Sequence, residues 1–200
     1  MNLSKTAHLT HLRASIAQAA SAGNTERQQI LKALLSCWNK KGSFLSFAPF
    51  LEDDTDRVVQ WFVADAFAYA KDEQVVELLM KAAVASINQN YRSTLIWPCI
   101  RYDCTKHLEF FTEFILRCSD PGEAMLAGVF VIEAMQGPFE PHTLKQTVHK
   151  LLTQDNPATD AAGKLQHEVF RVQAAHALLN KYFGQIDKDW NEDLANATPR

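Results

Sequence analysis

Interruptions to regular structure are few in this 200-residue chain, which holds seven glycines and seven prolines. The glycines are scattered, so a Gly-rich phosphate-binding loop is not expected. No stretch alternates apolar and polar residues with the period of two that a half-buried strand requires. No uninterrupted apolar run approaches the ~20 residues that span a bilayer. These absences favour a helical protein, and no membrane partner is expected.

Cysteine and histidine are too sparse and too scattered for a metal site. The four cysteines include no Cys-x-x-Cys pair and no histidine at zinc-finger spacing: Cys37, Cys99, Cys104 and Cys118. The histidine after His167 is His176, nine residues on rather than the four of a zinc-protease helix. We therefore expect no metal, no disulfide framework and no cofactor, and we interpret the cysteines as small buried hydrophobes.

Basic residues are not in excess, since 20 Lys and Arg stand against 23 Asp and Glu, for a net charge of −3. Nucleic-acid-binding proteins present basic stripes, so the composition argues against a nucleic-acid partner. Residues 1–22 mix polar with apolar side chains and carry His8, His11 and Arg13, where a signal peptide would be apolar. A cytoplasmic location is expected.

The pattern that is present is an apolar recurrence at three and four residues, the spacing of helices. One helix is expected over residues 3–21, and the capping-box sequence Thr25-Glu26-Arg27-Gln28 opens a second. Near the other end, Asn156-Pro157 opens a long helix that we expect Gly184 to stop. The predicted organisation is one domain over residues 1–186, with an N-terminal cap at 1–52, central repeats at 53–153, a capping helix at 156–184, and then a polar tail at 187–200.

In the central region, an apolar helix followed by an amphipathic helix occurs three times, with a period of ~33–36 residues. The predicted pairs lie at residues 56–70 and 73–87, 93–102 and 106–117, and 120–135 and 141–152. On the amphipathic helices Thr112 is expected to face outward and Leu152 inward. The large side chains expected in the core are Trp61, Phe67, Phe111, Phe130 and Ile132. Because one pair cannot bury its own apolar face, pairs must stack on one another.

A family resemblance appears at the stretch Arg101-Tyr102-Asp103-Cys104-Thr105-Lys106-His107-Leu108-Glu109-Phe110-Phe111 and continues from Glu123 to Met135. It resembles a group of small bacterial HEAT-like repeat proteins over roughly residues 56–152, although Pro98 departs from the pattern. The resemblance implies an all-α fold, a HEAT-like α-solenoid of stacked antiparallel helical hairpins. Some members of that group are encoded beside toxins and are regarded as immunity proteins of polymorphic toxin systems. It therefore implies a protein that neutralises a cognate toxin by direct binding.

In HEAT-like stacks the second helix of each pair lines the concave surface, so the resemblance also implies a partner-binding face. The residues expected on it are Glu73, Glu77, Lys81, Tyr102, Glu109, Phe110, Glu113 and Arg117. Most of the charges in this set are acidic, and acidic ridges attract basic partners such as a basic toxin domain. Exposed aromatic side chains flanked by charge are typical interface anchors.

Alternatives to this interpretation stay open. Asp65 and Glu133 lie on otherwise apolar helices, and they are either paired carboxylates in a cleft or structural acids that satisfy backbone amides or a basic group. No nucleophile motif accompanies them, so the chain is not expected to be an enzyme. A scaffold or adaptor without a toxin partner would fit the same pattern. A HEAT-like DNA glycosylase would need a basic groove. The sequence leaves the oligomeric state undetermined.

Overall fold

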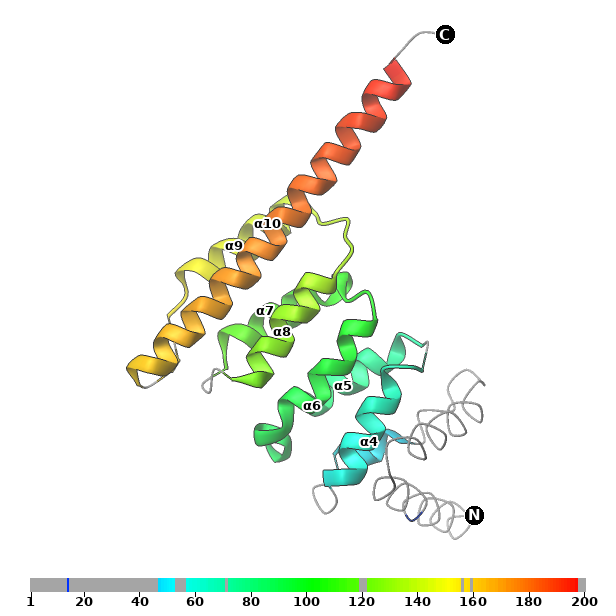
Figure 1. The fold of residues 1–200 in the computed structure, drawn as a ribbon, viewed down its shortest axis with the longest axis vertical. Coiled ribbons are helices and arrows are strands. Elements are labelled where there is room, and N and C mark those ends of the chain that lie inside the picture. Colours follow the sequence, from blue (N-terminus) through cyan, green and yellow to red (C-terminus); the bar gives the residue numbers. More distant parts are fainter. Residues whose placement is uncertain are drawn as a thin grey trace. The chain divides into compact units, whose positions relative to one another are not determined.

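The computed structural model describes residue 14 and residues 47–52, 57–70, 72–118, 122–155, 157–158 and 160–197, without the side chains of Val58 and residues 189–197. Helices are the only regular structure within those ranges, which confirms the predicted all-helical class (Figure 1). Apart from the helical residue Ala14, the two predicted N-terminal helices lie outside the described residues.

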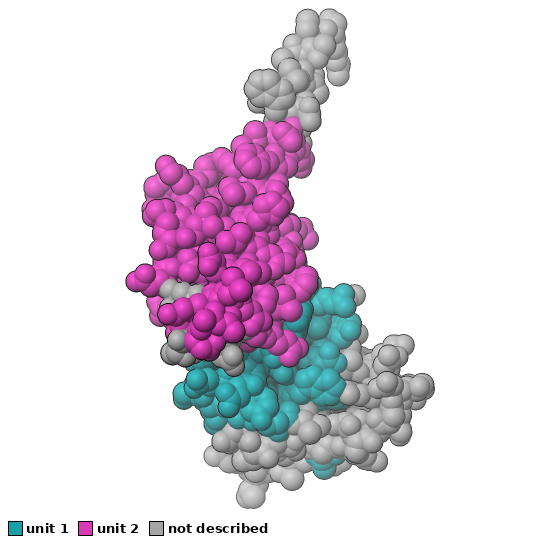
Figure 2. All heavy atoms as spheres, turned by 60° about the vertical axis from the view of Figure 1, so that its left-hand side comes forward, with its two compact units in different colours: residues 1–101 teal, residues 102–200 magenta. Residues whose placement is uncertain are grey.

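The chain divides into two compact units, residues 1–101 and residues 102–200 (Figure 2). Each unit contains fully buried aromatic or branched side chains, for example Phe62 and Phe67 in unit 1 and Phe111 and Ile115 in unit 2. The predicted single repeat domain, with its cap, central repeats and capping helix, stays a prediction.

In the described part of unit 1, short helices pack on one another through small apolar faces. Its elements are α3 (Ala48–Leu51), α4 (Arg57–Phe67), α5 (Gln74–Val84), η2 (Ser86–Tyr91), α6 (Arg92–Ile96) and η3 (Trp97–Arg101). Helix α6 packs on α4 and α5, and α3 packs on α4. The helix predicted at residues 93–102 is split into α6 and the 3-10 helix η3, because Pro98 lacks the N–H that would donate within an α-helix.

A buried polar network joins the ends of the unit 1 helices. Asn88 donates through Nδ2 to the carbonyls of Leu51 (2.9 Å) and Ala82 (2.9 Å). Gln60 donates through Nε2 to the Leu51 carbonyl (2.6 Å) and to Asn88 Oδ1 (2.7 Å). Arg57 completes the network with bonds to Gln60 Oε1 and Asn88 Oδ1. Because Gln60 and Asn88 are both buried, their bonds fix how α3, α4 and α5 meet.

Unit 2 is built around α8, which packs on α7 and α10. Its elements are η4 (Thr105–His107), α7 (Leu108–Leu116), α8 (Glu123–Ala134), α9 (Pro141–Thr153) and α10 (Ala161–Ala197). Helix α8 approaches α7 closely at Gly128, where a Cβ atom would lie 3.2 Å from Ile115 Cγ1. The first residue of α8 is Glu123, with Gly122 in the N-cap position, whereas the helix was expected from residue 120, which lies outside the described residues.

Helix α10 corrects the prediction that Gly184 ends the last helix, because it runs without a break from Ala161 to Ala197. No atom lies within 4 Å of a Cβ built on Gly184, so nothing packs there to force a turn. A glycine inside an exposed helix costs roughly 1 kcal/mol relative to alanine, which a long helix tolerates. The segment predicted as a polar tail therefore begins as a continuation of α10.

Four predicted side-chain orientations are wrong, and three are confirmed. Phe67, Phe111 and Ile132 are fully buried as predicted. Trp61 and Phe130 are 41% and 39% exposed, because α4 and α8 are apolar all round and the sequence does not mark their inner faces. Thr112 is buried and donates its hydroxyl to the Leu108 carbonyl (2.8 Å), whereas Leu152 is half-exposed.

The buried network predicts that Asn88→Ala destabilises unit 1. The substitution removes two donors and one acceptor, and it leaves backbone carbonyls at two helix ends with fewer partners. We expect a loss of about 2–3 kcal/mol in the free energy of unfolding, measured by urea denaturation. Asn90→Ala is the matched control, since Asn90 is exposed on the same 3-10 helix and should change stability by less than ~0.5 kcal/mol. Equal effects of the two substitutions would contradict the role assigned to the network.

The burial of the two phenylalanines in unit 2 predicts a matched pair of outcomes. Phe111→Ala should destabilise by ~3–5 kcal/mol, as is usual for a fully buried phenylalanine. Phe130→Ala removes the same atoms from a half-exposed site, so we expect about 1 kcal/mol or less. Thermal and urea unfolding of both variants checks this difference, and losses of equal size would show that α8 is wrongly oriented.

Candidate partner-binding surfaces

The predicted site residues of unit 1 lie along α5, from its N-cap residue Glu73 to Lys81 in its last turn, and face solvent. Glu73, Glu77 and Lys81 are exposed and follow one another at spacings of four residues along the helix. Lys81 Nζ lies 3.1 Å from Glu52 Oε1. Both side chains are largely in water, so this ion pair contributes little to stability. The α5 face is therefore a mixed-charge surface.

In unit 2, three predicted residues form one line along α7. Glu109, Glu113 and Arg117 are four residues apart, so they lie above one another on the same helix face. Glu113 pairs with Arg117 Nε at 3.0 Å and with Lys150 Nζ of α9 at 3.3 Å. These two cations neutralise the charge of Glu113, and the pair with Lys150 joins α7 to α9. Glu109 makes no ion pair with any described residue, and it is the acidic group that this face offers to a partner.

Phe110 lies beside this line and packs on its own helix. Its ring meets Phe111 edge-on at 5.2 Å between centroids and stacks near Phe114 at 6.2 Å. Phe110 itself is half-buried, whereas Phe111 and Phe114 are buried. An aromatic ring that is held in place by others, and is still partly open to solvent, suits an interface anchor. Tyr102 is also half-buried, at the start of unit 2.

The predicted site residues thus fall into two groups, one on each unit. Glu109, Phe110, Glu113 and Arg117 share α7, whereas Glu73, Glu77 and Lys81 belong to α5. A single ridge that combines both groups stays a prediction.

The motif that carries the family resemblance forms a turn. Asp103 Oδ1 accepts hydrogen bonds from the amide and hydroxyl of Thr105 and from the Gln136 amide. The Thr105 hydroxyl in turn accepts from the amide of Gly137 at 3.0 Å. Burial raises the pKa of Asp103, but these bonds outweigh it, so the pKa lies below its ordinary value. Asp103 and Thr105 therefore tie the loop after α8 to the start of η4.

The acidic residues of uncertain role are half-buried on separate units. Glu133 of α8 lies 3.5 Å from Gln173 Nε2 of α10, at the limit of a hydrogen bond. Asp65 lies in α4 of unit 1. Among the residues that the structure describes, no group of three His, Cys, Asp or Glu side chains is placed to hold a metal. Cys99, Cys104 and Cys118 are buried and unbonded to one another, as small buried hydrophobes would be.

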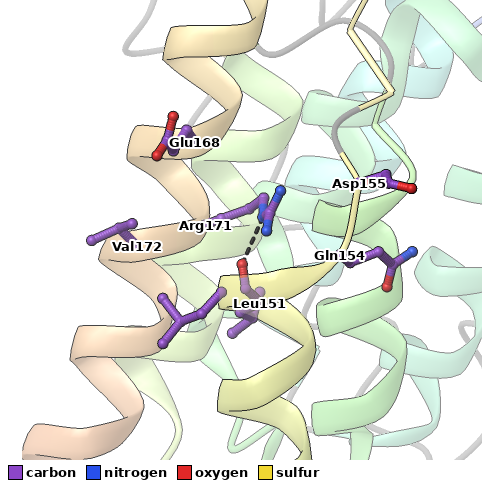
Figure 3. A pocket seen from close by; sticks show the side chains of 7 residues that line it. Leu151, Gln154, Asp155, Glu168, Arg171 and Val172 are labelled. Atoms are coloured by element: carbon purple, nitrogen blue, oxygen red, sulfur yellow. Dashed lines mark hydrogen bonds between the residues drawn. The ribbon is translucent and has the colours of Figure 1, made fainter.

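A groove of about 260 Å³ lies between the end of α9 and α10, and it was not predicted from the sequence (Figure 3). Arg171 reaches into it from α10 and donates through Nε to the Leu151 carbonyl at 2.6 Å. Although Arg171 is almost fully buried, the other polar residues of the groove are exposed: Gln154, Asp155 and Glu168. Half-exposed Leu152 and Val172 add an apolar wall. In the sequence, the available signal for this groove was the pair of apolar residues Leu152 and Val172, although Leu152 was expected to face inward.

A histidine is buried one turn before that arginine. His167 is fully inaccessible, and neither ring nitrogen has a well-aligned hydrogen-bond partner within the described part of the chain. The pKa of His167 lies below its ordinary value because burial disfavours the charged ring and Arg171 repels it. The carbonyls of Ile115 and Leu116, at the end of α7, oppose this shift only in part. His167 is therefore a neutral side chain at neutral pH.

Comparisons with family models, with curated proteins and with solved structures give no match to this chain. No helix in the described ranges is long and apolar enough to cross a membrane.

Buried His167 predicts that acidification weakens unit 2. The unfolded chain binds a proton at this ring near pH ~6.5, whereas the folded chain resists it, so stability is present above that pH and is lost as the pH falls below it. His167→Met keeps an apolar side chain of similar size and removes this proton. We expect the variant to lose less stability than wild type between about pH 7.5 and pH 5 in urea unfolding. Gln166→Met, on the exposed side, controls for the added methionine, and equal acid losses in wild type and His167→Met would contradict the assignment.

Proposed function

We propose that this chain is a protein-binding helical module whose contact surface includes the α7–α9 face of unit 2. The observation that carries the proposal is the arrangement around Phe110. Its partly exposed ring is held by two buried phenylalanines and stands beside the charged line of Glu109, Glu113 and Arg117. An aromatic anchor with a polar rim is the usual composition of an interface centre.

The charges on this face suit recognition rather than stability. Helix α7 packs on α9, and the Glu113–Lys150 pair lies across this contact, so the face combines side chains of both helices. Glu109 adds an uncompensated carboxylate at the first turn of α7. A partner with basic groups would meet Glu109 early in the encounter, while Phe110 would supply contact area.

A more specific proposal rests on the sequence resemblance. The repeated pairs of apolar and amphipathic helices support a HEAT-like solenoid, and the likeness to HEAT-like immunity proteins supports toxin neutralisation without catalysis, in the cytoplasm. The partner would then be a basic toxin domain that the α7–α9 face covers.

The direct test is to express the protein encoded beside this one in a bacterial host, with and without this chain. Growth arrest that this chain relieves, together with a purified complex of the two proteins, supports the immunity proposal. A non-toxic neighbour, or toxicity that this chain leaves unchanged, overturns it. Phe110→Ala should weaken the complex at least tenfold, whereas Phe130→Ala, a half-exposed phenylalanine on α8, should not. Equal effects of the two would exclude the α7–α9 face.

The charge on Glu109 predicts a change in association kinetics. Glu109→Lys should slow the capture of a basic partner and weaken its dependence on salt, because exposed charges act mainly on the association rate. Glu113 is unsuitable for this reversal, since a lysine there would face Arg117 and Lys150. Glu123→Lys is the control, because Glu123 also lies in the first turn of its helix and its reversal has the same unfavourable interaction with the helix dipole. Rates measured across a salt series decide, and an unchanged rate at low salt would remove Glu109 from the interface.

A further inference from the structure

Helix α10 carries a second apolar stripe that unit 2 does not cover. Its members follow one another at alternating spacings of four and three residues: Leu165, Val169, Val172, His176, Leu179, Phe183 and Ile186. Five of the apolar members are 42–66% exposed. A contiguous apolar stripe on a helix surface marks an interaction site, whereas scattered exposed hydrophobic residues do not.

The opposite face of α10 makes the contacts within unit 2. His167, Arg171, Ala174 and Leu178 are buried there, where α10 packs on α8 and α9. Further along, Gln185 Oε1 accepts a hydrogen bond from the Phe139 amide at 2.8 Å. The inner face is therefore occupied as far as residue 185. Inner positions include a histidine, an arginine and a glutamine, so the exposed stripe is more apolar than the buried one.

The spacing identifies the kind of partner. An average of 3.5 residues between apolar positions keeps them on one side of a slightly underwound helix, which is the seam of a coiled coil. Over 22 residues the stripe is about 33 Å long, at 1.5 Å per residue. Figure 1 shows α10 extending past α7, α8 and α9 of its own unit, and the exposure of the five stripe members leaves its outer face accessible to another helix.

The flanks of the stripe favour a second copy of this chain. One flank carries Gln166, Gln173, Asn180 and Asp187, and the other carries Glu168, the buried Ala175 and Tyr182. Flanking charges normally select a partner of opposite sign, and like charges oppose self-pairing. Each flank has one carboxylate, and the two lie at opposite ends of the stripe, so two identical helices can approach with little of that repulsion.

The available area is sufficient for such a pair. A large apolar side chain has a surface of roughly 150 Å², and about half of it is exposed in each of the five members. Two copies would therefore bury on the order of 800 Å² of apolar surface. The flanking side chains of the two copies would need to add only about 200 Å² to reach the ~1,000 Å² that a specific interface needs. We propose that two copies of this chain associate through the outer stripe of α10, as a two-helix coiled coil with His176 as its polar central position.

Sedimentation velocity and light scattering of the full chain over a range of concentrations test the proposal. Wild type should form a dimer. Val169→Glu with Phe183→Glu places carboxylates in the seam and should weaken the dimer about 100-fold, at roughly tenfold per substituted position, with helicity retained because both sites are half-exposed. The control is Val84→Glu with Ile87→Glu, two equally exposed apolar residues in unit 1, which should leave the dimer unchanged.

A gain of affinity gives an independent readout. His176→Ile removes the polar central position and should tighten the dimer, since a polar residue in a seam lowers its stability. A wild-type chain that stays monomeric at every concentration overturns the proposal, as does a dimer that survives the two carboxylates. Glu109→Lys should leave the dimer intact, so failure here and failure of the proposed partner-binding face are distinguishable.

Discussion

Every α-helix ends with backbone carbonyls that have no partner within the helix, and burying such an end requires donors from elsewhere in the chain. Side chains from later elements meet this requirement in both units. In unit 1, the amides of Gln60 and Asn88 donate to the last carbonyl of α3, and Asn88 also donates to the end of α5. In unit 2, Arg171 donates to the end of α9. Gln60, Asn88 and Arg171 are therefore buried joints between helices.

The chemistry of the donor decides how each joint responds to its surroundings. Amide donors carry no charge, so the joint in unit 1 is complete at any pH at which the chain folds, provided Arg57 stays paired with it. The joint in unit 2 includes a buried cation, which adds to the effect of burial in lowering the pKa of His167 one turn away. Unit 2 therefore contains a neutral histidine next to an arginine, at the place where α10 meets the ends of α7 and α9. This makes α10 the element on which the packing of unit 2 depends.

Sequence patterns predicted the helices well where one face was clearly apolar. The amphipathic helices α5, α7 and α9 begin and end within a few residues of the predicted bounds, because periodicity marks both their existence and their inner faces. Helices α4 and α8 lack that asymmetry, and this is why Trp61 and Phe130 were wrongly expected inside. Thr112 was misplaced for another reason: its hydroxyl is satisfied by the Leu108 carbonyl of its own helix, so a polar side chain costs little in the core.

The candidate surfaces show a similar limit. Position along α7 was enough to predict that Glu109, Glu113 and Arg117 share a face. The neutralisation of Glu113 depends on Lys150, which lies 37 residues away in the chain and whose approach no local pattern specifies. The groove beside Arg171 likewise forms only where α9 and α10 pack side by side, and no local sequence pattern specifies that packing.

Helix α10 departs furthest from the rule that apolar residues face inward. Both of its stripes recur every 3.5 residues on average, so periodicity alone cannot tell them apart. The inner stripe holds Arg171 and Gln185, which bond to the end of α9 and to the loop at Phe139, and it also buries His167. On the outer face, α10 presents Leu165, Val169 and Phe183 to solvent. Such an inverted distribution raises the solvation cost of an isolated unit 2, and covering the outer stripe removes that cost. The proposed pairing of two α10 helices would cover the apolar stripe that lies opposite this polar inner face.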